Sequence, residues 1–111
     1  MNRDVQARWV AALRSGEYPQ ATGCLRNDVG FCCYGVLTDL AVKAGVGEWG
    51  TDFDPSLGLL PRLVVDWAGL VDADPYLAGF DADPYLAVPA SVWNDAGLPF
   101  TAIADAIEAQ L

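Results

Sequence analysis

Hydrophobic residues recur with a helical period in four segments of this chain. In residues 2–15, apolar side chains at spacings of three and four line one face, and Gly16 is a typical stop signal. The second segment, residues 36–44, also ends at a glycine. The third follows Pro61, a residue suited to the first turn of a helix, and the fourth follows Pro99. We expect the last helix to pack against the first and complete the core.

The stretch between the first two helices has a different pattern. Two short apolar runs flank the sequence NDVG, whose residues favour a tight turn, so residues 23–34 are predicted to form a hairpin. Adjacent Cys32 and Cys33 would then point to opposite faces of one strand. The predicted fold class is therefore α+β, with about four short helices packed on a small antiparallel sheet that includes the 23–34 hairpin. Residues 1–111 are expected to form a single domain.

A perfect tandem repeat stands in the second half of the chain. Residues 72–78 and 81–87 both read DADPYLA. One repeated unit is too little for a solenoid, so we interpret it as a local duplication in a surface segment. The Asp-Pro pairs favour extended or turn backbone, and each copy is expected to hold a short strand after a turn. The aspartates lack the glycine and distal glutamate of an EF-hand loop, so we expect no metal here.

Composition indicates a protein that lies outside the membrane and associates with itself. Hydrophobic residues make up 53% of the 111 residues, and four are tryptophans, which favours a homo-oligomer. No apolar run approaches the roughly 20 residues needed to cross a bilayer, and the polar N-terminus is unlike a signal peptide. Three cysteines, two of them adjacent, suit a reducing compartment better than a disulfide framework. We therefore expect a cytoplasmic protein without a membrane contact.

The charge is unevenly distributed along the chain. The net charge is −9, yet residues 1–26 carry four arginines against two acids, while residues 27–111 carry two cations against thirteen acids. A binder of duplex nucleic acid normally shows a basic face, so that class is disfavoured. A small anionic ligand should lie against the first quarter of the chain. The plainer interpretation is that the acids keep the protein soluble.

The chain contains no histidine, and this removes many kinds of catalyst. Ser-His-Asp and Cys-His nucleophile pairs, imidazole bases and most zinc sites are excluded. No glycine-rich phosphate loop of recognised form occurs, and no spacing singles out a pair of carboxylates for acid–base work. We expect no enzyme activity and no cofactor.

The remaining polar and aromatic residues suit recognition of a nucleotide-like ligand. Arginines hold phosphates in bidentate fashion, tyrosine rings stack on bases, and a glutamine amide orients polar edges. The candidate ligand-binding residues are Arg14, Tyr18, Gln20, Arg26, Tyr34, Asn94 and Asp95. Two alternatives stay open. Arg14 also suits the C-terminal end of a helix dipole, and Asn94 with Asp95 also suits a cap of the final helix.

The run WVAALRSGEYPQATGCLRNDVGFCCYGVLTDLA resembles a family of small uncharacterised bacteriophage proteins with the pattern W-ALRSG-Y-Q, G-LR and FCC-GVL-DL. The later stretches LPRLVVDWAGL and WNDAGLPFTAIADAIEAQL resemble the continuation of that pattern. The likeness covers most of the chain except residues 47–58 and the duplicated segment. It implies a phage origin and no catalytic residue.

Small histidine-free phage proteins often act by binding, and one class captures nucleotide-derived signals of bacterial immunity. By analogy of size and context, we expect a counter-defence protein that sequesters a small nucleotide-derived immune signal without turnover, in the cytoplasm of the infected cell. The alternative is a protein-interaction module that inhibits or adapts a host protein target through an acidic surface. A hydrolase that acts through carboxylates ranks last.

Overall fold

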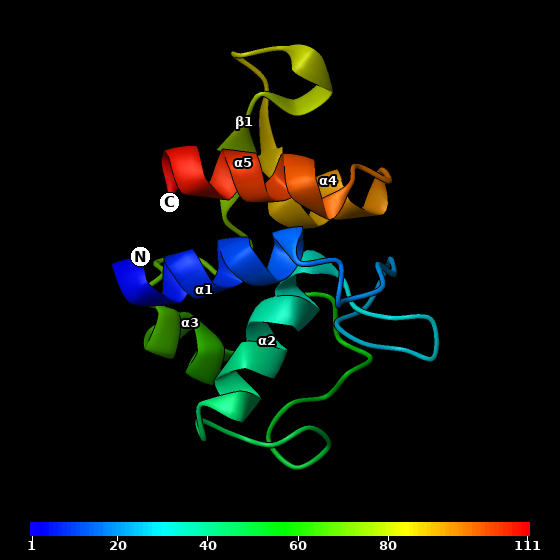
Figure 1. Ribbon diagram of the computed structural model, residues 1–111, viewed down its shortest axis with the longest axis vertical. Helices are drawn as coiled ribbons and strands as arrows, with labels where there is room; N and C mark the ends of the chain where they lie inside the picture. The colour runs from blue at the N-terminus through cyan, green and yellow to red at the C-terminus, as the bar shows by residue number, and fades with distance from the viewer.

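Two helices from opposite ends of the chain form the centre of the fold. The computed structural model describes residues 1–111, and in it helix α1 (Arg3–Arg14) and helix α5 (Phe100–Gln110) lie side by side and run in opposite directions (Figure 1). The side-chain amide of Gln6 donates to the carbonyl oxygen of Ile107 at 3.1 Å across this contact. The predicted packing of the last helix on the first is confirmed.

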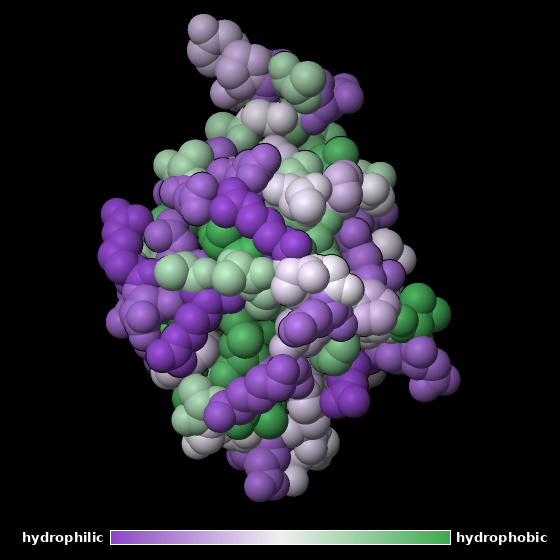
Figure 2. All heavy atoms as spheres, viewed as in Figure 1, coloured by the Kyte–Doolittle hydropathy of each residue, from purple (hydrophilic) through white to green (hydrophobic).

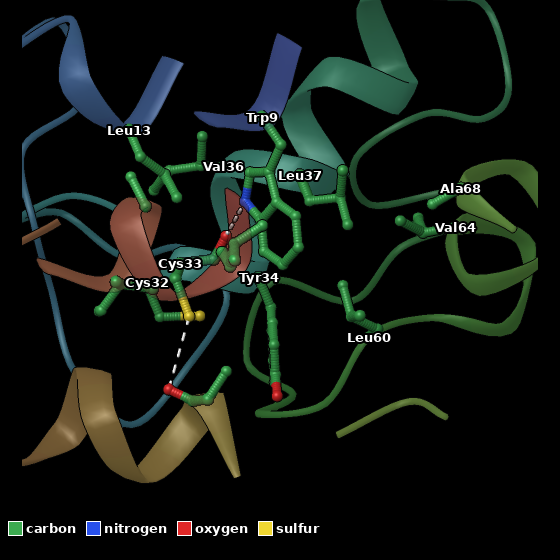
Figure 3. Close-up of a cluster of buried hydrophobic side chains, with 14 of the residues drawn as sticks. Trp9, Leu13, Cys32, Cys33, Tyr34, Val36, Leu37, Leu60, Val64 and Ala68 are labelled. Carbon is green, nitrogen blue, oxygen red and sulfur yellow. Dashed lines mark hydrogen bonds between the residues drawn. The ribbon is translucent and has the colours of Figure 1, made fainter. Parts of the chain in front are cut away.

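Helix α1 forms where its amphipathic pattern and its cap agree. The side chain of Asn2 accepts hydrogen bonds from the backbone N–H groups of Asp4 and Val5, which satisfies two of the unpaired donors at the helix start. Trp9 lies on the buried face, and its indole N–H donates to the carbonyl oxygen of Cys33 at 3.0 Å (Figure 3). This bond ties α1 to the first turn of the next helix.

Three further helices complete the helical part. They are α2 (Cys33–Lys43), α3 (Arg62–Ala68) and α4 (Ala90–Asp95). The first half of α2 is buried on all sides, and its side chains lie in the centre of one core of 24 buried residues (Figure 3). A glycine at position 35 is required here, because a Cβ would lie 1.7 Å from the carbonyl oxygen of Leu25.

The only sheet begins in the duplicated segment and ends two residues beyond it. Strand β1 (Tyr76–Ala78) pairs antiparallel with strand β2 (Ala87–Pro89), and a short 3₁₀ turn, η1 (Phe80–Ala82), lies between them. The first repeat copy supplies β1 as predicted, whereas the second contributes only its last residue to β2. The connection between the strands projects from one end of the molecule (Figure 1). An α+β fold of short helices on a small antiparallel sheet is thus confirmed, with five α-helices.

The prediction of strands in residues 23–34 is wrong. The NDVG sequence does turn, with the N–H of Asn27 donating to the carbonyl oxygen of Gly30 at 2.9 Å, but only an isolated bridge joins Arg26 to Phe31. One further backbone bond joins the two sides, from the N–H of Cys32 to the carbonyl oxygen of Leu25 at 3.2 Å. The other groups pair with other segments: Leu25 donates to Leu57, and Phe31 donates to Pro19. Because these partners come from elsewhere in the chain, the stretch forms a loop that leads into α2.

The two adjacent cysteines also differ from the prediction. Both are buried, and neither lies in a strand. Cys32 precedes α2 and its sulfur accepts a hydrogen bond from the N–H of Gly35 at 3.4 Å, while Cys33 is the first residue of the helix. Helix α2 therefore begins three residues earlier than its hydrophobic period indicates.

Polar and apolar side chains alternate on the surface seen in Figure 2. Figure 2 shows hydrophilic side chains over much of one face, with apolar side chains between them. No helix of this protein has the length and hydrophobicity that a membrane span requires.

Candidate functional site

A polar hollow lies between the NDVG turn and the loop that follows α2. It has a volume of about 540 Å³ and is lined by the residues Arg26, Asn27, Asp28, Trp49 and Pro55, and we call it the Arg26 hollow. The backbone N–H of Arg26 donates to the carbonyl oxygen of Pro55 at 3.1 Å, so the two loops that form the hollow are joined.

Arg26 is the cation of this hollow, and its guanidinium group has no polar partner. The group lies 5.4 Å from the ring centre of Phe31 and 5.6 Å from that of Trp49, which is the geometry of a cation–π contact. No carboxylate lies within 4.0 Å of it, and its side chain makes no hydrogen bond in the protein. Its N–H groups are therefore available to an external acceptor.

The other five cationic side chains are already engaged within the protein. Four pair with carboxylates and one donates to a glutamine. These are Arg8, Arg14, Lys43 and Arg62 with acids, and Arg3 with Gln6.

Trp49 is held in place by a hydrogen-bond network around the half-buried carboxylate of Asp39. Its indole N–H donates to one carboxylate oxygen of Asp39 at 3.1 Å, and the hydroxyl of Tyr18 donates to the other at 2.7 Å. Lys43 lies 3.3 Å from the same carboxylate. Burial alone raises the pKa of Asp39, but the hydrogen bonds from Tyr18, Trp49 and Lys43 outweigh it and hold the pKa below its usual value. Asp39 is thus charged at neutral pH and orients the tryptophan.

The rings beside Arg26 form a continuous aromatic row. Tyr18 contacts Phe31 edge-on with ring centres 5.0 Å apart, and Phe31 lies 6.5 Å from Trp49. Trp49 in turn contacts Phe53 at 6.3 Å. These distances are those of favourable aromatic pairs, so the platform under the guanidinium is rigid.

Arg14 lies in a different environment from Arg26. Its guanidinium contacts two acids of α5, Asp105 at 2.7 Å and Glu108 at 3.1 Å, and these hydrogen bonds, that of Glu108 first, raise its pKa. It does not line the Arg26 hollow. The structure therefore does not bring the two predicted phosphate-holding arginines to one hollow.

Tyr34 lies in the core. It is fully buried among the core side chains (Figure 3). Its hydroxyl donates to Asp74 at 2.6 Å. Burial, with the hydrogen bond to Asp74 as a second cause, raises the pKa of Tyr34. Neither face of the ring is open to solvent, so the predicted stacking role does not fit its position.

Gln20, Asn94 and Asp95 do come together at a junction of three segments, where Asn94 is buried, Gln20 half-buried and Asp95 exposed. Asn94 accepts from the N–H of Cys33 and from the amide of Gln20, both at 3.1 Å, and donates to the carbonyl oxygen of Ala21 at 2.8 Å. Asp95 accepts a hydrogen bond from the backbone N–H of Gly23 at 3.0 Å. All these bonds are internal, and Pro99, rather than Asn94 or Asp95, precedes α5. The junction joins α4 to the start of α2.

The cysteines offer little nucleophilic character. Burial raises the pKa of Cys32 to about 11 and that of Cys33 well above its ordinary value, so both thiols are neutral at physiological pH. Cys33 donates its S–H to the carbonyl oxygen of Ala90 at 3.7 Å (Figure 3). These two residues pack and hydrogen-bond within the core.

A family model described as Domain of unknown function (DUF8296) matches residues 1–111. The chain belongs to the DUF8296 family. No curated protein and no solved structure matches this DUF8296 chain.

Arg26 and Tyr18 of this neighbourhood are predicted from the sequence, but most of the hollow is not. Asn27 and Asp28 carry only a turn signal, and Trp49 lies in a segment without any hydrophobic period. A tryptophan in a glycine-rich loop was the one available signal, since such a ring needs a partner to pack against.

Proposed function

We propose that this protein binds a small nucleotide-derived anion in the Arg26 hollow and holds it without turnover. The observation that carries the proposal is the guanidinium group of Arg26, which is stacked on Phe31 and Trp49 but has no acceptor within the protein. A stacked guanidinium keeps its N–H edge free for a phosphate, and arginine matches phosphate oxygens in bidentate geometry. The aromatic side chains beside it suit a base.

The proposed biological role is phage counter-defence in the cytoplasm of an infected cell, by sequestration of an immune signal. Support comes from the resemblance of the runs around residues 9–41 and 93–111 to small phage proteins. The lack of histidine and the neutral buried thiols support binding without chemistry. The hollow is also within the size range of ligand sites, roughly 300–1,000 Å³.

The test is calorimetry with a panel of cyclic and linear adenine and guanine nucleotides. A charge-assisted hydrogen bond contributes about 1.5–3 kcal/mol, so Arg26→Ala should weaken binding about 10- to 150-fold. Arg62→Ala is the matched control, because it removes the same charge from an exposed pair on α3. Bound nucleotide that is released intact after heating supports sequestration, whereas a converted product contradicts it. Absence of binding across the panel refutes the proposal.

A second candidate function is an interaction with a host protein or a second copy of the chain. It is favoured by an apolar hollow of about 430 Å³ beside the chain ends, whose lining includes Val71 and Tyr76. Val71 is 100% exposed, and Tyr76 is 62% exposed. Large exposed apolar side chains next to acids suit a partner surface. Sedimentation of the pure protein tests self-association, and Val71→Asp should abolish it.

A further inference from the structure

The polar groups of the Arg26 hollow include both hydrogen-bond donors and an acceptor. Arg26 and the amide nitrogen of Asn27 are donors, and neither has a partner in the protein. The amide oxygen of Asn27 is already used, because it accepts from the N–H groups of Val29 at 2.9 Å and Gly30 at 3.1 Å. The carboxylate of Asp28 has no cation within 4.0 Å. Asp28 is thus the side-chain acceptor that the hollow can offer a ligand.

Trp49 contributes an aromatic ring without a hydrogen-bonding group. Its only donor, the indole N–H, is directed to Asp39 at 3.1 Å. Stacking on such a ring is tolerant of base identity, since every base has a π face. Selection between bases must therefore come from edge groups that meet the free acceptor, Asp28, or the free amide donor of Asn27. Asp28 is the charged group of the two, so it is expected to discriminate more strongly.

A carboxylate with two oxygens discriminates between the bases through their donors. Guanine presents an N1–H and an N2 amino group side by side, which match both oxygens of one carboxylate. Adenine has a single amino group next to a ring nitrogen that accepts, and this lone pair would face the carboxylate. Uracil and cytosine likewise place an acceptor beside their one donor group. Only guanine offers two adjacent donors.

We infer that the Arg26 hollow selects a guanine nucleotide, with Asp28 binding the base edge and Arg26 binding the phosphate. This inference rests on the proposed function, and it adds the class of base and a specificity-determining residue. The two charged side chains come from neighbouring positions, so one ligand meets an acceptor and a cation within the same hollow. A ligand with donors at one end and negative charge at the other satisfies both.

The experiment compares GMP, inosine monophosphate and AMP by calorimetry. A site that bonds two donors rejects an analogue that leaves its polar group unpaired, so GMP should bind at least tenfold more tightly than AMP. Inosine monophosphate keeps the N1–H but lacks the amino group, and should fall between them. Asp28→Asn should weaken GMP at least tenfold without weakening AMP. Asp66→Asn, which removes the same charge from an exposed pair on α3, should change neither.

The outcomes separate this inference from the proposed function. Equal affinity for GMP and AMP, with both lost in Arg26→Ala, overturns guanine selection and leaves the anion site standing. A preference for GMP that Asp28→Asn does not reduce overturns the assignment of Asp28. If neither nucleotide binds the wild-type protein, the inference falls together with the mononucleotide site.

Discussion

Asn94 is expected to be one of the largest single contributors to stability among the polar residues. It is fully buried on α4, and it accepts a hydrogen bond from the backbone N–H of Cys33, the first N–H of α2. That donor has no partner inside its own helix, so a side chain from another helix satisfies it. Asn94 also donates to the carbonyl oxygen of Ala21. Asn94→Ala removes both partners at once.

The magnitude follows from what the substitution leaves unpaired. A buried backbone group without a partner costs about 1–3 kcal/mol, and here the N–H of Cys33 and the carbonyl of Ala21 are both affected. The amide of Gln20 keeps its second acceptor, the carbonyl oxygen of Leu98 at 2.9 Å. We therefore expect a loss of about 2–5 kcal/mol in the free energy of unfolding. That is a large share of the roughly 5–15 kcal/mol typical of a domain.

Urea denaturation followed by circular dichroism measures this loss. Asn94→Leu is the second variant. Its larger side chain leaves less room for a water that could bond the unpaired N–H and carbonyl groups, so it should cost at least as much stability as Asn94→Ala. Val92→Ala is the control on the same helix, where the side chain is exposed, and should change stability by less than about 0.5 kcal/mol. A loss below 1 kcal/mol in both Asn94 variants would refute the reasoning.

Three further predictions use the same denaturation assay. Gly35→Ala should cost about 3 kcal/mol or more, because its Cβ would meet the carbonyl oxygen of Leu25 and the backbone must shift; a loss below 1 kcal/mol contradicts this. The free energy of unfolding should fall as pH rises from 9 to 11, because burial raises the pKa of Cys32 from 9.0 to about 11 and the unfolded thiol ionises first. Cys32→Ala should make that slope less steep without removing it, because burial also raises the pKa of Cys33 and Tyr34, and an unchanged slope speaks against the Cys32 thiol as a source. Ala82→Gly should stabilise the protein by up to about 1 kcal/mol, since Ala82 has a φ of 60°, which glycine adopts without strain. Ala78→Gly in β1 is the control and should destabilise, and a loss of stability in Ala82→Gly counts against backbone strain at Ala82.

The helices could be predicted because each carries its own evidence. The period of apolar residues and the terminal glycine or proline are local signals. Helix α1 lies within one residue of its predicted range, and α3 and α5 begin directly after Pro61 and Pro99 as predicted. The start of α2 was missed for a physical reason. The run FCC is apolar throughout, and a short apolar run does not distinguish a strand from a buried helix turn.

The position of β2 and its pairing with β1 could not be predicted from the sequence, because both strands are three residues long. Alternation over three positions is too short to detect, and the turn chemistry of NDVG was a stronger signal than that of the repeat. In the structure the backbone around Leu25 finds its partners at Leu57 and elsewhere. Such long-range pairing depends on where the glycine-rich loop packs, which no local pattern encodes.

The residues of the candidate site differ in the same way, since some carry a local sequence signal and others depend on long-range contacts. Arg26 was found because an arginine beside aromatic residues in an acidic chain is unusual at the level of composition. Arg14 met the same criterion, yet its role depends on α5, which lies more than ninety positions away. Residue type identifies candidates, but only tertiary contacts show which of them are already neutralised.

That distinction decides how an acidic protein can hold an anion. At physiological salt the screening length is about 8 Å, so most of the net charge of −9 is not felt at a given hollow, and the nearest groups set the local potential. Arg14 stands between Asp105 and Glu108, and an incoming phosphate would meet a net negative cluster there. Arg26 has no carboxylate within 4.0 Å and is oriented by aromatic rings, whose quadrupole holds a cation without neutralising it. Stacking on rings, in place of pairing with acids, is what keeps one guanidinium group available in this chain.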